Sequence, residues 1–367
     1  MSIEETYFSL LRSALWGDGC PPVRKEDVPV LSDIAIKQST APMIYDRLLA
    51  CGAGISAEKA VRMKQFIAKN IMTHTSLNTL LAKVVKELRG MGIDGVLLKG
   101  QGNASHYRRP ELRACGDIDY YVGEENFMEA AHYISRLAGE KEFNEKRVSP
   151  KHYDANIGQL EVEIHRRSQV LYPEKRDRIY CRYSADGLHK DLVPIEFAGV
   201  EVMTPEPTFN ALFIFQHYWN HLTTSGIGMR HICDWTVHLD AFSDKIDRQR
   251  LETMIKELGL ETPWKCCAYI AVEKLGLPEE KMPLYDKDYA KKGERLLRMI
   301  MKYGNFGRAH LPKLSRPANY ILGKAYSLSH HIRKFIDTTA ISPKLAIYYL
   351  QDMLGNGFKA VFKDLRK

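Results

Sequence analysis

Two aspartates inside an otherwise apolar segment constrain the fold of this chain more than any other feature. The segment reads Gly-Asp-Ile-Asp-Tyr-Tyr-Val over residues 116–122, and its hydrophobic flank is typical of a β-strand. Alternate residues of a strand share one face, so the carboxylates of Asp117 and Asp119 are expected to point the same way. Like charges at close range repel, and each must be partly desolvated. A divalent cation cancels this repulsion, and oxygen ligands of this kind suit Mg²⁺ bound together with substrate phosphates.

A second acidic strand is predicted over residues 160–165, Leu-Glu-Val-Glu-Ile-His. Val162 and Ile164 face one side of this strand, and Glu161, Glu163 and His165 face the other. Glu163 can then supply a third carboxylate to a metal site with the two aspartates. An acidic triplet also arises by chance, as at residues 286–288, which we interpret as solvated surface.

These residues together form a pattern that is found in a known family. The pattern consists of Leu-Leu-Lys-Gly at 97–100, Arg113, Gly-Asp-Ile-Asp at 116–119 and Val-Glu-Ile-His at 162–165. It resembles the poorly characterised nucleotidyltransferases of the DNA polymerase β-like superfamily, most closely over residues 93–170. The superfamily usually has a Gly-Ser or Gly-Gly turn where this chain has Lys99-Gly100. This altered turn favours the alternative of a catalytically inactive protein of the same fold that binds nucleotide or a partner protein.

The resemblance implies an enzyme that moves a nucleoside monophosphate from an NTP to an acceptor hydroxyl or phosphate and releases pyrophosphate. Asp117, Asp119 and Glu163 would be the catalytic residues and would hold two Mg²⁺ ions, one near the attacking oxygen and one on the leaving triphosphate. Glu163 can also help to remove the proton of the nucleophile. His165 would orient Glu163 or contact the acceptor, and Glu161 is an auxiliary candidate on the same face.

Four residues are candidates for nucleotide binding. Lys99 follows an apolar strand and precedes Gly100, so its ammonium group can hold a phosphate as a point charge. Arg113 can bridge the triphosphate or only neutralise the carboxylates. The resemblance also places an arginine and an aspartate near Arg230 and Asp234, where Arg230 can meet a phosphate or a nucleobase. A structural ion pair between these two residues, four positions apart on a helix, is equally consistent with the sequence.

The expected fold class is α+β, with a small mixed sheet of nucleotidyltransferase type between two helical regions. Residues 1–92 are predicted as an N-terminal helical region, 93–205 as the α/β core and 206–367 as a C-terminal helical domain. The clearest early helix begins after Ser56 and ends at Gly90. Strands are predicted over 95–98, 118–122, 152–157, 160–165 and, at an edge, 200–203. Helices are predicted over 101–106, 127–137, 209–222, 229–241, 251–258, 263–275, 320–336 and 343–353.

The pair His217 and His221 has the spacing of a zinc-protease helix, but Tyr218 stands where the glutamate base would be needed. We therefore interpret the two histidines as core or inter-domain contacts. No Walker A sequence, dinucleotide-binding glycine pattern or kinase motif is present.

Composition and charge limit the kinds of binding partner that are expected. The chain has 367 residues and a net charge of +8, without the basic stripe interleaved with aromatics that single-stranded nucleic-acid binders use. The resemblance implies an NTP with a small-molecule or protein acceptor, and the lack of such a stripe makes nucleic acid a weaker alternative. No membrane span or signal peptide is apparent, and the seven cysteines lack paired spacing. These features predict a cytoplasmic protein with reduced thiols.

Overall fold

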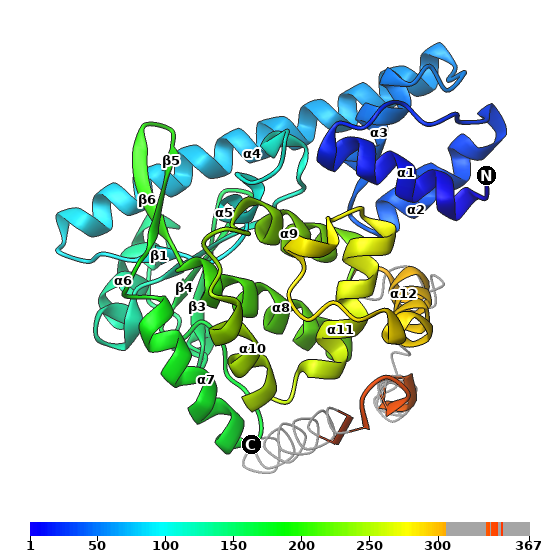
Figure 1. The fold of residues 1–367 in the computed structure, drawn as a ribbon. Coiled ribbons are helices and arrows are strands. Elements are labelled where there is room, and N and C mark those ends of the chain that lie inside the picture. Colours follow the sequence, from blue (N-terminus) through cyan, green and yellow to red (C-terminus); the bar gives the residue numbers. More distant parts are fainter. Residues whose placement is uncertain (306–334, 338, 344–345, 348–367) are drawn as a thin grey trace, which may run out of the picture.

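The structure, a computed structural model, describes residues 1–305, 335–337, 339–343 and 346–347. The predicted helices over 320–336 and 343–353 therefore fall mostly outside the described residues. Within them, a six-stranded mixed sheet is combined with many helices (Figure 1), as the α+β prediction requires.

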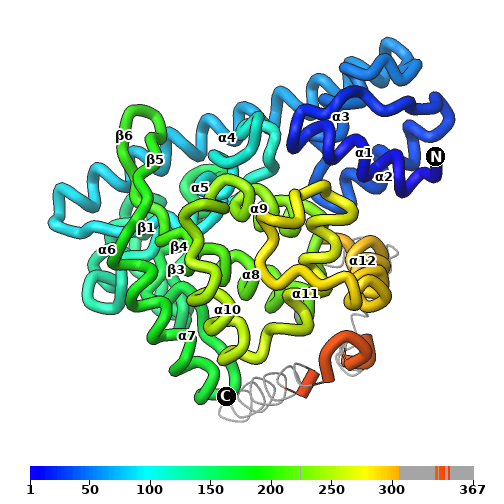
Figure 2. The backbone as a smooth tube through the Cα atoms, in the orientation of Figure 1, coloured from blue at the N-terminus to red at the C-terminus, as the bar shows by residue number. Residues whose placement is uncertain are grey.

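Helices form the first quarter of the chain. Three short ones precede a long one: α1 (Ile3–Trp16), α2 (Val28–Lys37), α3 (Ala41–Ala50) and α4 (Ala57–Gly90). The side chain of Ser56 accepts a hydrogen bond from the backbone N–H of Lys59, and α4 ends at Gly90, so both predicted ends of this helix are confirmed. Figure 2 shows α1–α3 gathered at one end of α4 and the strands toward the other.

The sheet has the strand order β3-β4-β2-β1-β6-β5. The strands are β1 (Val96–Leu97), β2 (Asp117–Tyr121), β3 (His152–Ile157), β4 (Leu160–His165), β5 (Val193–Phe197) and β6 (Val200–Thr204). The chain connects β3 and β4 as an antiparallel hairpin, whereas β2 and β4 lie parallel. Each predicted strand is present.

The two faces of the central strands have opposite character. Ile118 and Tyr120 of β2, with Val162 and Ile164 of β4, belong to a hydrophobic core completed by α4 and by α6 (Gly123–Leu137). The α4 residues in this core share one helical stripe and include Leu77, Leu81, Val84 and Leu88, as predicted. Because side chains alternate along a strand, the acidic residues of β2 and β4 face the other way.

A second hydrophobic core joins the N-terminal helices to helices that come after β4 in the chain. The latter are α7 (Glu174–Gly187), α8 (Pro207–Thr224), α9 (Met229–Ala241), α10 (Arg248–Glu257), α11 (Glu261–Tyr269) and α12 (Ala290–Tyr303). The short helix predicted over 101–106 is α5 (Gln101–Ala104), and it contacts α9. Two of these helices, α8 and α9, line a cavity together with the carboxylate face of the sheet.

Two predictions need correction. Residues 200–203 form a strand, but β5 occupies the edge of the sheet and β6 lies inside it. Cys20 and Cys51 form a disulfide, so the expectation that all seven thiols are reduced was wrong; the described free cysteines are Cys115, Cys181, Cys233, Cys266 and Cys267. Among the described residues, no helix is both long enough and apolar enough to cross a membrane.

Candidate functional site

Carboxylates from two neighbouring strands gather on the polar face of the sheet. The parallel pairing of β2 and β4 sets Asp117 beside Glu161 and Asp119 beside Glu163. One oxygen from each of Asp117, Asp119 and Glu163 lies within 4.8 Å of the others, a spacing that can hold a metal ion. Glu161 does not belong to this group, although it lies on the same strand face as Glu163.

Asp119 is the innermost member of the cluster, with a side chain that is 0% exposed. Its Oδ1 atom lies 2.8 Å from Nζ of Lys99 and 3.0 Å from Nε2 of His165. Its buried Oδ2 atom has no hydrogen-bond partner among the described residues. Burial by itself would raise the pKa of Asp119, but Lys99 and His165 outweigh it and lower that pKa. An ionised, buried oxygen without a hydrogen-bond partner is well suited to be a ligand of a cation.

Lys99 reaches the cluster from the end of β1. Burial opposes the charge of its ammonium group, but Asp119 and Asp117 outweigh this effect and raise the pKa of Lys99. The turn that follows requires glycine: Gly100 has a φ of +62°, and a Cβ atom there would lie 3.1 Å from the carbonyl oxygen of Asp117. The Lys99-Gly100 turn thus brings β1 close to the start of β2.

Two histidines hold Glu163. Its Oε2 atom lies 3.2 Å from Nδ1 of His152 and 3.0 Å from Nε2 of His165. Burial would raise the pKa of Glu163, but the two histidines and Lys99 lower it far below the ordinary value. Glu161 has the opposite tendency, because burial and the charge of Glu163 raise its pKa. The two glutamates therefore differ in charge environment as well as in position.

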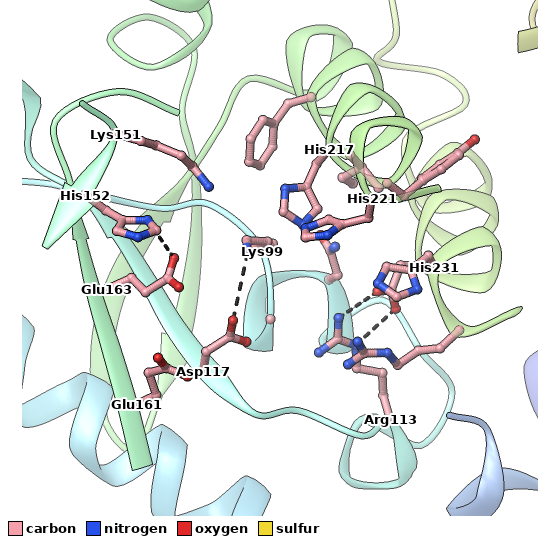
Figure 3. A pocket seen from close by; sticks show the side chains of 17 residues that line it. Lys99, Arg113, Asp117, Lys151, His152, Glu161, Glu163, His217, His221 and His231 are labelled. Carbon is pink, nitrogen blue, oxygen red and sulfur yellow. Dashed lines mark hydrogen bonds and ion pairs between the residues drawn. The ribbon is translucent and has the colours of Figure 1, made fainter. Parts of the chain in front are cut away.

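The cluster opens into a cavity of about 310 Å³ between the sheet and helices α8 and α9. Figure 3 shows Asp117, Glu161 and Glu163 along one side of it and His217 and His221 facing them from the other. Asp119 and His165 lie behind this surface, since both are fully buried.

Basic side chains that are buried or half-buried surround the cavity. The side chain of Lys151 points into it (Figure 3) and has no carboxylate within 4 Å among the described residues. Burial and the nearby Lys99 lower the pKa of Lys151. Burial also lowers the pKa of His221 to about 4, and it places the pKa of His217 and His231 well below the ordinary value. These three imidazoles are therefore neutral at physiological pH.

Arg113 and Asp234 form a buried bidentate ion pair next to the cavity. Arg113 donates from Nε and Nη2 to the two carboxylate oxygens of Asp234, at 3.0 and 2.6 Å, and Tyr107 donates to Asp234 at 2.6 Å. Arg230 donates to the carbonyl of Ala114 at 2.5 Å, and its buried Nε has no partner among the described residues. The pair suggested between Arg230 and Asp234 is thus replaced by a pair between Arg113 and Asp234.

All ten predicted site residues come together in the structure. They lie on the cavity or directly behind it and are Asp117, Asp119, Glu161, Glu163, His165, Lys99, Gly100, Arg113, Arg230 and Asp234. Sequence reasoning missed Lys151 and His152 and placed His217 and His221 only among core or inter-domain contacts. The alternation of the predicted hairpin contained a signal for His152, which pairs with His165 across the two strands.

Comparison with known proteins identifies a family. A family model described as "Uncharacterised nucleotidyltransferase" matches residues 24–276, which is more than half of the chain. No curated protein and no solved structure shows a significant match. The matched segment begins in the N-terminal helices, contains the whole sheet and the helices that enclose the cavity, and ends after α11.

Proposed function

Because the chain belongs to this uncharacterised nucleotidyltransferase family, we propose that it transfers a nucleoside monophosphate from an NTP to an acceptor. In this reaction an acceptor oxygen forms a bond to the α-phosphorus, the bond to the β-phosphate oxygen breaks, and pyrophosphate leaves. The acceptor is expected to be a small molecule or a protein side chain.

The observation that carries this proposal is the convergence of Asp117, Asp119 and Glu163 at a cavity that is also lined by cationic side chains. Oxygen ligands and the free Oδ2 atom of Asp119 fit Mg²⁺. When bound, such ions would neutralise charge on the triphosphate and polarise the reacting oxygens. The two aspartates and Glu163 would hold them.

Lys151 and Arg230 are the residues best suited to the phosphates of the NTP. Both are half-buried cationic groups that line the cavity, and neither has a carboxylate within 4 Å among the described residues. A desolvated cation without a counter-ion is costly, and an anionic ligand removes that cost. Arg113 already forms an ion pair with Asp234, so its main effect is to hold the side of the cavity next to Arg230 in place.

Glu163 fits the role of a cation ligand better than that of a base. Burial would raise its pKa, but His152, His165 and Lys99 outweigh this effect and hold the pKa far below the ordinary value. A carboxylate with such a low pKa is a weak proton acceptor. We therefore assign Glu163 to holding the cation rather than to removing the proton of the acceptor.

Label transfer tests the proposal. The purified protein is incubated with each NTP labelled at the α-phosphate, with Mg²⁺ and with a cell extract as the source of acceptors. We expect label to appear in one macromolecule or metabolite, together with release of pyrophosphate, and to be absent with Asp119→Asn. Equal labelling by the wild type and by this variant would overturn the proposal.

One observation favours a second candidate function, a protein that binds nucleotide without turning it over. Lys99 already neutralises Asp119 without any metal, so the acidic cluster does not depend on a cation for its stability. A thermal-shift titration separates the two. Stabilisation by NTP that requires both Mg²⁺ and Asp119 supports the enzyme, whereas stabilisation that is independent of metal supports the binding protein.

A further inference from the structure

A group of nitrogen and oxygen donors lies beside the carboxylate cluster. Nδ1 or Nε2 of His152 and His165 and a carboxylate oxygen of Glu163 all lie within 4.8 Å of one another. Glu163 Oε2 is central to the group, at 3.2 Å from Nδ1 of His152 and 3.0 Å from Nε2 of His165. All three residues belong to the β3–β4 hairpin, so the strand pairing holds the donors in place.

The hydrogen bonds of His165 point to a cation in this group. Its Nδ1 atom lies 3.4 Å from the carbonyl oxygen of Arg167, a long contact. A carbonyl oxygen can only accept a hydrogen bond, so in this contact the proton is on Nδ1. Nε2 then faces two carboxylate oxygens, one from Asp119 and one from Glu163, each at 3.0 Å. Ionised carboxylates also only accept, so this contact needs either a second proton on the ring or a cation shared by the three groups.

The same arrangement is common in metal-binding histidines. A metal-ligating imidazole usually donates from its other ring nitrogen to a carbonyl or a carboxylate, which fixes the tautomer and the ring orientation. The Arg167 carbonyl takes this place for His165. His165 is fully buried, whereas His152 is partly exposed and lines the cavity, so an ion can reach the group from the cavity side.

We propose that His152, Glu163 and His165 form a binding site for a first-row transition metal such as Mn²⁺ or Zn²⁺. Imidazole nitrogen suits Zn²⁺, and Mn²⁺ accepts mixed nitrogen and oxygen ligands, whereas Mg²⁺ prefers oxygen ligands. The site shares Glu163 with the carboxylate cluster, so one glutamate contacts both positions. Its existence does not depend on nucleotidyl transfer.

Electron paramagnetic resonance with Mn²⁺ tests the proposal directly. The full-length protein is stripped with a chelator, loaded with Mn²⁺ in the absence of nucleotide and measured by electron spin-echo modulation. We expect coupling to a ¹⁴N nucleus of directly bound imidazole. A spectrum without ¹⁴N coupling would overturn the proposal, and this measurement needs no variant.

Calorimetric titrations add a comparison between ions. His152→Gln is expected to weaken Mn²⁺ binding by roughly ten- to a hundredfold, the effect of disturbing a metal-site histidine. Mg²⁺ affinity should change by no more than about threefold, because Mg²⁺ relies on the oxygens. His132→Gln is the matched control, since His132 is exposed on α6, and it should leave both affinities unchanged. An equal loss for both ions, or no loss for Mn²⁺, contradicts the proposal.

These outcomes are independent of the proposed reaction. If the ¹⁴N coupling is present but no NTP is turned over, the proposed metal site is supported and the proposed nucleotidyl transfer is refuted. If NTP is turned over with Mg²⁺ but Mn²⁺ shows no nitrogen ligand, only the transition-metal site fails.

Discussion

The ammonium group of Lys99 lies 2.8 Å from Oδ1 of Asp119 and is also within 3.9 Å of Oδ2 of Asp117. A lysine thus serves as an internal counter-ion for the acidic cluster. A metal ion that enters the cluster would compete with this charge, and a phosphate that enters with it would offer Lys99 a new partner. The stability of the metal-free protein and its affinity for metal are therefore coupled through one side chain.

Lys99→Met should lower the stability of the metal-free protein and raise its affinity for Mg²⁺. Removing the ammonium group leaves the carboxylates uncompensated, at a cost of roughly 3 kcal/mol, and also removes a competitor of the metal. Thermal melts in chelator and in Mg²⁺ would measure both effects, with the ion restoring much of the lost stability. Lys64→Met, at an exposed position of α4, is the control and should behave as the wild type. A melting temperature that Lys99→Met leaves unchanged in chelator would show that Lys99 is not the counter-ion.

Asp117→Asn and Asp119→Asn should both abolish metal-dependent turnover but should differ in stability. The charge of Asp119 and burial raise the pKa of Asp117, so removing the charge of Asp117 relieves repulsion. Asp119 is instead bound to Lys99 and His165, so its replacement leaves buried cationic partners without a carboxylate. We expect circular dichroism melts in chelator to show unchanged or slightly raised stability for the first variant and a loss for the second. The same loss in both would refute the assigned difference.

Glu163→Gln should reduce the rate of nucleotide turnover by about a hundredfold or more, the scale of a lost metal-site contribution. Glu161→Gln is the matched comparison, because both glutamates lie on the polar face of β4. Only Glu163 has an oxygen in the group with Asp117 and Asp119. Steady-state rates at saturating Mg²⁺ would decide between them. A larger loss of rate for Glu161→Gln would mean that Glu161, and not Glu163, contributes to the metal site.

Asp234→Asn should destabilise the protein by about 3–5 kcal/mol, since it leaves the buried guanidinium of Arg113 unpaired. Burial raises the pKa of Asp234, but Arg113 outweighs it and the net shift is downward. A lowered folded-state pKa stabilises the protein above the unfolded value near 3.9, and this contribution is lost as the pH falls further. Chemical denaturation at pH 7 and at pH 3 should therefore show a smaller difference between wild type and variant at the lower pH.

The control for this experiment is the exposed pair of Glu174 and Arg178, whose side chains are 81% and 69% exposed. Glu174→Gln should change the free energy of unfolding by less than about 1 kcal/mol, because water and salt screen a surface pair. Similar losses from the two variants would mean that the Arg113–Asp234 pair is not a structural element.

The sequence predicted the elements whose periodicity is set by burial on one side. β3 and β4 were predicted with their observed bounds, and α9 with both ends, because apolar residues alternate or recur on the face that meets a core. α7 and β5 were not predicted. α7 is rich in charged residues and buries only Arg176, Tyr180 and Gly187, so its helical pattern is weak. β5 carries a proline, which the edge of a sheet tolerates but which argues against a strand in the sequence.

The acidic half of the site was predictable because it depends on strand alternation alone. The basic half was not, since it depends on the packing of α8 and α9 over the sheet. Lys151 and His217 approach the cavity from a hairpin and from α8, and no local pattern links them. The choice of Arg113 rather than Arg230 as the partner of Asp234 likewise depends on the contact between segments far apart in the chain.

The long helix α4 limits how this protein can change in evolution. Met63, near its start, belongs to the core of the N-terminal and later helices, whereas Leu77 and Leu88 belong to the core behind the carboxylates. With 34 residues, α4 spans about 50 Å. Recombination that replaced the N-terminal helices, including α4, with those of an unrelated protein would also remove the apolar stripe of α4 that packs in the core with β2. Sequence divergence in this helix is therefore expected mainly on its exposed side, and the N-terminal helices are expected to have been inherited together with the sheet.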